Sequence, residues 1–164
     1  MPPLHHRAPG PVAGALAAAA AGDARVELVA DGAHLDDATV RMVFALLGPE
    51  RVVLVTDAMA AAGMADGTYR LGPQSVRVEA GVARLGDAAG APLAGGTSRL
   101  LDVVRRCVGA GIDITDAVTA ATRSPARALG LDGPALVPGA RADLVVTDAD
   151  LRPLRVLRRG VWVS

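Results

Sequence analysis

Two aspartates stand where strand-like segments end, and a carboxylate at such a place usually has a task. Asp57 follows the strand-like segment 52–56, whose residues 52–55 are apolar, and Asp31 follows the strand-like segment 26–30, shortly before His34. Carboxylate and imidazole groups can take a proton from an attacking water and return it to a leaving group. Either aspartate could instead cap a helix or form a turn. Because the pattern occurs twice and includes a histidine, we favour a functional site.

The elements around these residues predict a β-α-β unit. The runs 26–30 and 52–56 are expected to be strands, and the segment between them is helical from Asp36-Asp37 to Gly48-Pro49. A helix of small residues is expected upstream, at 12–21. A right-handed crossover makes the two strands parallel. Their carboxyl ends then share one edge, which is where (β/α)-barrels carry their catalytic groups.

The remainder of the chain changes character. Residues 69–85 alternate apolar and polar side chains, which indicates a small antiparallel excursion, and 89–96 is a glycine-rich loop. Helices are expected from a cap at Thr97 or Ser98 to Val108, from Asp113 or Thr115 to Ala121, and from an N-cap at Ser124 with Pro125 next. Strand-like segments at 142–147 and 154–163 predict a second small sheet.

Composition limits the classes of function. The chain has 164 residues, which fits one domain but is too short for a complete eight-stranded barrel. Its 17 basic and 17 acidic residues balance, so neither nucleic acid nor a membrane surface is an expected partner. The single cysteine, Cys107, lies in an apolar helical pattern and is expected to be a buried structural thiol. The absence of a disulfide framework favours the cytoplasm.

Several phrases of the sequence occur together in an order that identifies a family. They are PPLHHR at 2–7 with Pro9-Gly10, ADGAH at 30–34, VTDAM at 55–59, LAGG at 93–96, SPARALGL at 124–131 and PGARADLVV at 138–146. Over essentially its whole length the chain resembles the C-terminal part of the N-acetylglucosamine-6-phosphate deacetylases, within the amidohydrolase superfamily.

The resemblance implies an α/β fold: the last two βα units of a (β/α)8 barrel, with strands of a small β-sandwich domain. On this basis residues 1–130 are a partial barrel domain with a β-excursion at about 68–86, and residues 131–164 belong to the sandwich. It also implies a homodimer that hydrolyses the acetamide of N-acetylglucosamine 6-phosphate. The divalent metal of the family, of the zinc or iron class, is expected to be held by residues upstream, so no metal ligand is assigned here.

Site roles follow from the same resemblance. Asp57 matches the proton-transferring aspartate of the last barrel strand, His34 a substrate histidine and Arg7 a phosphate contact. Arg suits a 6-phosphate because guanidinium binds its oxygens in pairs. Residues Ala94, Gly95 and Gly96 match a substrate-contacting segment, in which small residues let the backbone approach a ligand. His5 and His6 are adjacent and point apart, which argues against joint metal ligation.

Two alternatives stay open. The chain could be a non-catalytic truncated product or a partner-dependent module, or it could be another metal-dependent amidohydrolase. Arg7 with His34 favours a phosphosugar over the latter. Two barrel strands alone leave two unpaired edges and an apolar face. The isolated chain is therefore expected to be marginally folded or partner-dependent, and to show negligible deacetylase activity.

Overall fold

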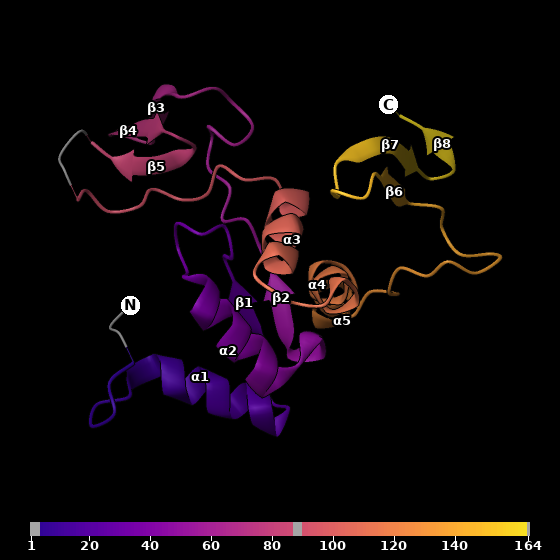
Figure 1. Ribbon diagram of the computed structural model, residues 1–164, viewed down its shortest axis with the longest axis horizontal. Coiled ribbons are helices and arrows are strands. Elements are labelled where there is room, and N and C mark those ends of the chain that lie inside the picture. The colour runs from indigo at the N-terminus through magenta and orange to yellow at the C-terminus, as the bar shows by residue number, and fades with distance from the viewer. Residues whose placement is uncertain (1–3, 87–89, 164) are drawn as a thin grey trace.

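A short parallel sheet lies at the centre of the computed structural model, which describes residues 4–86 and 90–163. Strand β1 (Val26–Leu28) pairs in parallel with β2 (Val52–Leu54), with Val26 opposite Val52. The predicted parallel pair is confirmed, although each strand is shorter than expected. All three residues of β2 are buried, because helices cover this strand (Figure 1). Pro2, Pro3 and Ala89, which entered the sequence interpretation, lie outside the described residues.

Two helices precede and join these strands. Helix α1 (Gly10–Ala21) ends at Gly22, whose φ of 95° suits a residue without a Cβ. Helix α2 (Asp37–Leu47) begins after Asp36, whose carboxylate accepts a hydrogen bond from the Ala38 amide at 2.8 Å. Gly48 ends α2, and the 3-10 turn η1 (Pro49–Arg51) leads into β2. Both helices confirm the prediction within a few residues.

Three further helices contact β2: α3 (Leu100–Gly109), α4 (Ile114–Ala121) and α5 (Arg123–Ala128). The predicted caps of α3 and α5 were wrong. Arg99 rather than Thr97 or Ser98 precedes α3, and its amide donates to the Asp102 carboxylate at 3.2 Å. Ser124 lies inside α5, where its fully buried hydroxyl donates to the Pro49 carbonyl at 2.7 Å. That bond ties α5 to η1, the turn that leads into β2.

The main core gathers apolar side chains from β1, β2, α2, α3 and α4. Its buried members are Leu28, Ala30, Val40, Val43, Phe44, Val52, Leu54, Val103, Val104, Cys107, Ala117, Ala120 and Ala121. The expectation of a buried thiol at Cys107 is confirmed, and burial together with the nearby Asp37 charge raises its pKa to about 11. A thiol with so high a pKa stays protonated at neutral pH.

The antiparallel excursion is also confirmed. Strands β3 (Gly67–Leu71), β4 (Gln74–Glu79) and β5 (Val82–Leu85) form a sheet in that order. A smaller cluster packs beneath it, with Met59, Ala61, Val76, Val78, Ala83 and Ala94 buried. This sheet therefore has its own core, built partly from the loop that follows β2.

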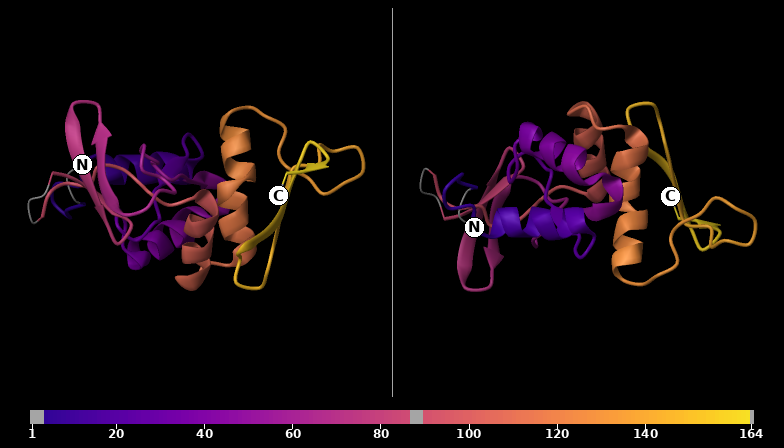
Figure 2. Two further views of the ribbon diagram at one scale, coloured as in Figure 1. Left: turned by 90° about the horizontal axis from the view of Figure 1, so that it is seen from above. Right: turned by 90° about the horizontal axis from the view of Figure 1, so that it is seen from below.

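The C-terminal sheet contains β6 (Leu144–Thr147), β7 (Pro153–Arg158) and β8 (Val161–Trp162). The single strand expected at 154–163 was wrong, because Arg159 and Gly160 adopt φ values of 50° and 78° and turn the chain back on itself. The guanidinium of Arg155 lies 3.8 Å from the Trp162 ring centroid. In the views of Figure 2 this sheet lies beyond α4, at the opposite end from β3–β5.

Across residues 4–86 and 90–163, no helix is both long and apolar enough to span a membrane.

Candidate active site

The strand ends bring three of the singled-out side chains together. His34 contacts the Asp31 carboxylate through Nδ1 at 2.9 Å, and its Nε2 lies 3.7 Å from the Asp57 carboxylate. The loops after β1 and β2 supply these residues, because parallel strands end at the same edge. The sequence pattern that linked Asp31, His34 and Asp57 therefore corresponds to one cluster in space.

Asp31 is the fixed member of the cluster. Only 6% of its side chain is exposed, and one carboxylate oxygen accepts the backbone amides of Ala33 and His34, each at 2.9 Å. Burial alone would raise the pKa of this carboxyl. The hydrogen bonds from the His34 amide and ring and from the Ala33 amide outweigh burial, so the pKa of Asp31 lies below its usual value.

An ionised Asp31 decides how His34 is presented. A carboxylate accepts hydrogen bonds and cannot donate them, so the ring must donate from Nδ1. The Nε2 atom is then left on the side of Asp57. Asp31 thus orients the imidazole, which goes beyond the turn-shaping role that the sequence suggested for it.

Asp57 is the open member of the cluster, with 61% of its side chain exposed. Its backbone has a φ of 49°, a left-handed conformation that costs a residue with a Cβ about 1 kcal/mol. A neighbouring segment supports this turn: the Gly96 amide donates to the Asp57 carbonyl at 2.7 Å, and the Met59 amide donates to the Gly96 carbonyl at 3.0 Å.

The segment predicted to contact substrate, residues 94–96, lies beside Asp57. Its first residue has a different environment from the two glycines that follow. Ala94 is buried in the small core under β3–β5, and its amide donates to the Ala83 carbonyl at 3.0 Å. Gly95 and Gly96 lie against the backbone of residues 56–59. Sequence reasoning did not foresee this backbone contact, because a bridge between distant loops leaves no periodic signal.

The N-terminal loop does not join the cluster. His5, His6 and Arg7 are exposed. The expectation that His5 and His6 point apart was wrong: their ring centroids lie 4.4 Å apart, with the ring planes tilted by 34°. The Arg7 amide donates to the His5 ring at 3.3 Å. Among the residues that the structure describes, no hydrogen bond or ion pair joins the Arg7 guanidinium to His34 or Asp57.

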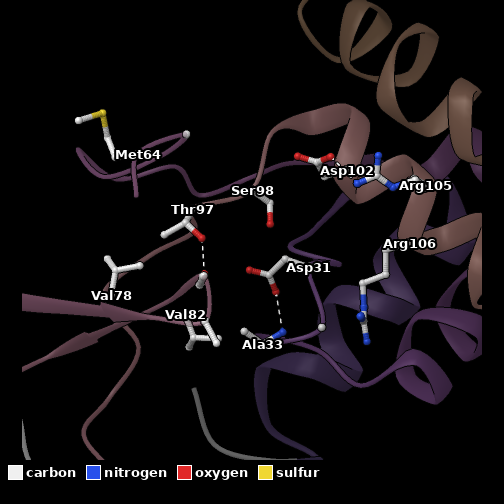
Figure 3. Close-up of a pocket in the computed structure, with 14 residues that line it drawn as sticks. Asp31, Ala33, Met64, Val78, Val82, Thr97, Ser98, Asp102, Arg105 and Arg106 are labelled. Carbon is white, nitrogen blue, oxygen red and sulfur yellow. Dashed lines mark hydrogen bonds and ion pairs between the residues drawn. The ribbon is translucent and has the colours of Figure 1, made fainter. Parts of the chain in front are cut away.

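A cavity of about 530 Å³ lies behind the Asp31 loop, between the tips of β4 and β5 and the beginning of α3. Figure 3 shows Asp31, Thr97 and Ser98 around it, with the Thr97 hydroxyl donating to the Gly81 carbonyl. Arg105 and Arg106 on its wall are paired with Asp102 and Asp37, at 2.7 and 3.1 Å. Of the three clustered side chains, Asp31 lines this cavity, whereas His34 and Asp57 do not.

The metal-ligating side chains of the described residues are not gathered at one place. Within the described ranges, no group of three or more His, Cys, Asp and Glu side chains could hold a metal ion. Asp31 already directs its oxygens to Ala33 and His34. These side chains therefore do not form a metal site by themselves.

Comparison with known proteins identifies the class of protein to which this chain belongs. The Amidohydrolase family model matches residues 5–163. The chain belongs to the amidohydrolase family.

Within this family, the chain is similar to several amino-sugar 6-phosphate deacetylases. The chain is 39% identical, over 98% of its length and 94% of the relative's, to an Escherichia coli K12 protein provisionally named N-acetylgalactosamine-6-phosphate deacetylase. It is 34% identical to the N-acetylglucosamine-6-phosphate deacetylase of Bacillus subtilis, over 98% of this chain and 40% of that protein. A solved Mycobacterium smegmatis N-acetyl-D-glucosamine-6-phosphate deacetylase, an aspartate-to-alanine variant in complex with that sugar phosphate, matches with 43% identity and a TM-score of 0.90. The match covers 99% of this chain and 43% of that one.

These relatives confirm the resemblance found in the sequence. The chain spans less than half the length of the Bacillus and Mycobacterium proteins.

Proposed function

We propose that this chain carries the proton-transferring part of an amino-sugar 6-phosphate deacetylase, with N-acetylglucosamine 6-phosphate as substrate. The observation that carries the proposal is the placement of His34 Nε2 3.7 Å from the Asp57 carboxylate, with Asp31 fixing the other ring nitrogen. An open carboxylate beside an oriented imidazole suits the hydrolysis of an amide, which needs a proton moved from water to nitrogen.

The fold supports this placement. We propose that β1 and β2 are the last two strands of a (β/α)8 barrel, within a barrel domain at 1–130, and that 131–164 belongs to a small β-sandwich. Asp57 and His34 lie after the carboxyl ends of β2 and β1, where barrel enzymes carry their chemistry. We propose a homodimer as the assembly on the family resemblance. We propose the cytoplasm as the location because a single cysteine provides no disulfide framework.

The proposed reaction moves one proton twice. Asp57 accepts a proton from the attacking water as the water oxygen bonds to the acetamide carbon. When the C–N bond breaks, the same carboxyl gives that proton to the departing nitrogen, and the products are acetate and glucosamine 6-phosphate. Asp57 can accept this proton only if its carboxyl group is ionised when the water attacks.

The remaining residues bind the sugar phosphate. The His34 Nε2 faces the site, where it donates to the acetamide carbonyl when protonated or accepts from a sugar hydroxyl when neutral. We propose Arg7 as the phosphate contact and the backbone of 94–96 as a further contact. Metal of the zinc or iron class would have to be held by residues other than those described here, and no step above is assigned to it.

A second substrate is favoured by one comparison. The Escherichia coli K12 relative carries an N-acetylgalactosamine-6-phosphate deacetylase name and matches nearly the whole of both chains. The two sugars differ only in the orientation of one hydroxyl, and the proton transfer proposed for Asp57 is the same for both. The alternative of a different amidohydrolase activity has no such observation behind it.

The test is a chimera. Residues 5–163 replace the matching part of the Mycobacterium smegmatis deacetylase, with which the fold agrees at a TM-score of 0.90. Acetate release is then measured with each of the two sugar phosphates and with N-acetylglucosamine lacking phosphate. We expect turnover of a 6-phosphate and little turnover of the free sugar, whereas this chain alone with zinc or iron(II) should release no acetate.

The control is a chimera carrying Asp23→Asn, because Asp23 is exposed and lies before β1, at the opposite end of the strand from the cluster. It should match the unsubstituted chimera. A folded chimera that hydrolyses neither sugar phosphate would refute the proposed function.

A further inference from the structure

We propose that the Gly95-Gly96 segment is a positioning device that sets the direction of the Asp57 side chain. The effect of this segment on catalysis rests on the proposed function. Its effect on the position of Asp57 does not. The family resemblance assigns these glycines to substrate contact, and the structure adds a contact with the backbone that carries the carboxylate.

Two hydrogen bonds form the device. The Gly96 amide donates to the Asp57 carbonyl at 2.7 Å, and the Gly96 carbonyl accepts from the Met59 amide at 3.0 Å. Together they make a parallel bridge at Ala58 and Gly96, in line with the end of β2. The turn containing Asp57 is thus held from both sides by one residue.

The close approach requires a residue without a side chain. A Cβ on Gly95 would lie 2.9 Å from the Asp57 carbonyl oxygen and 3.3 Å from the Met59 Cβ, at a φ of 113°. A Cβ on Gly96 would overlap the Thr56 carbonyl oxygen. Real Cβ atoms almost never approach a backbone oxygen so closely, so a side chain here must displace the Asp57 turn.

Displacement of this turn would move the Asp57 carboxylate relative to His34. Asp57 holds a φ of 49°, which is unfavourable for a residue with a Cβ and persists only where neighbours enforce it. Its carboxylate is largely exposed and has a 3.7 Å contact with His34 Nε2. The backbone bridge therefore fixes the geometry that side-chain packing does not.

The first measurement uses the His34 ring as a reporter in the chain as it stands. The ring resonances are recorded by ¹H–¹⁵N NMR and assigned with His34→Gln, and Asp57→Ala defines the spectrum of a ring without the neighbouring carboxylate. Gly95→Ala should shift the Nε2 resonance toward that of Asp57→Ala, with Nδ1 unchanged because Asp31 still holds it.

The matched control is Gly111→Ala. Gly111 has a φ of 94° after α3 and has open space where a Cβ would be, so this variant imposes similar backbone strain without touching Asp57. Its His34 resonances should be those of the unsubstituted chain. A folded Gly95→Ala protein with an unchanged His34 ring would overturn the proposal.

Hydrogen exchange keeps the test decisive if Gly95→Ala does not fold. In the unsubstituted chain the Gly96 and Met59 amides should exchange slowly, because both are donors in the bridge. Exchange of these amides as fast as in an unstructured peptide would overturn the proposal.

Kinetics distinguish positioning from structure. In the chimera described above, Gly95→Ala should lower kcat about 10- to 100-fold while KM stays within about threefold, since a small misplacement of a reacting group slows chemistry more than binding. A rise in KM with kcat unchanged would overturn the positioning role. If the unsubstituted chimera is inactive, the proposed function fails, but the NMR and exchange results still decide whether the bridge positions Asp57.

Discussion

The region around β1 and β2 differs sharply from the C-terminal sheet in the burial of its side chains. The first buries side chains from two strands and three helices in one core, and that core lies directly beneath the cluster of Asp31, His34 and Asp57. In the second, no residue between 129 and 163 is buried. Val161 and Leu154, for example, are 64% and 60% exposed.

The difference shows where the site gets its rigidity. Strand β2 is buried along its whole length, so the turn at Asp57 is attached to a fixed base. The C-terminal sheet is held mainly by its own hydrogen bonds and by Leu151, which packs from the β6–β7 connection against the main core. We therefore expect the candidate site to tolerate changes in β6–β8 and to respond to changes in the main core.

The largest effect is expected from a pair of identical substitutions. Val103→Ala removes two methyl groups from a fully buried position and should lower the free energy of unfolding by roughly 2–3 kcal/mol. Val161→Ala removes the same groups from a largely exposed position and should change it by less than about 0.5 kcal/mol. Urea unfolding followed by far-UV circular dichroism measures both, and equal effects would contradict the comparison.

An intermediate effect is expected at Asp31. Its folded pKa is below the ordinary value of 3.8, so its carboxylate stabilises the folded state above that value, and the contribution is lost as the pH falls through the folded pKa. Asp31→Asn should therefore lower the free energy of unfolding by about 1–2 kcal/mol at pH 7. The difference between the two proteins should shrink below pH 3.8.

The control for this pH dependence is Asp36→Asn, because asparagine caps a helix about as well as aspartate. Its unfolding free energy should stay within about 0.5 kcal/mol of the unsubstituted chain at pH 7. A constant difference between Asp31→Asn and the unsubstituted chain over the whole acid range would contradict the role given to the Asp31 charge.

The smallest effect is expected in the C-terminal sheet. Arg155→Ala removes the guanidinium above Trp162 and should cost about 0.5 kcal/mol, as expected for an exposed cation–π contact. Trp162 is the only tryptophan of the chain, so its fluorescence reports on this sheet alone. The circular dichroism transition of the helices should not move; an equal shift of the helix and tryptophan transitions would show that the sheet and the core unfold as one unit.

Local patterns predicted the site-bearing elements well. Two apolar runs on either side of a helix capped by Asp36 were enough to predict β1, α2 and β2, because burial imposes a periodic pattern of apolar residues. The N-caps of α3 and α5 were predicted at the wrong residues. At α5, the tertiary hydrogen bond from Ser124 to the Pro49 carbonyl outweighs the capping preference of serine. The turn that divides β7 from β8 was missed because Arg159, a poor turn former by type, adopts a positive φ there.

The cluster itself was only partly predictable. Shared strand ends placed Asp57 and His34 together, whereas the orienting role of Asp31 needed the observed contact with the ring at 2.9 Å. The bridge between Gly96 and Asp57 joins loops far apart in the sequence, and no residue spacing predicts such a contact. Arg7 was assigned by resemblance alone, and its role stays a prediction.

The most direct test of the account replaces the Asp57 carboxylate by an amide of the same shape. In the chimera, Asp57→Asn should lower kcat for the sugar phosphate by about a thousandfold, because an amide cannot carry the proton, while the dissociation constant of the substrate stays within about threefold. Turnover by Asp57→Asn within about threefold of the unsubstituted chimera would contradict the central claim.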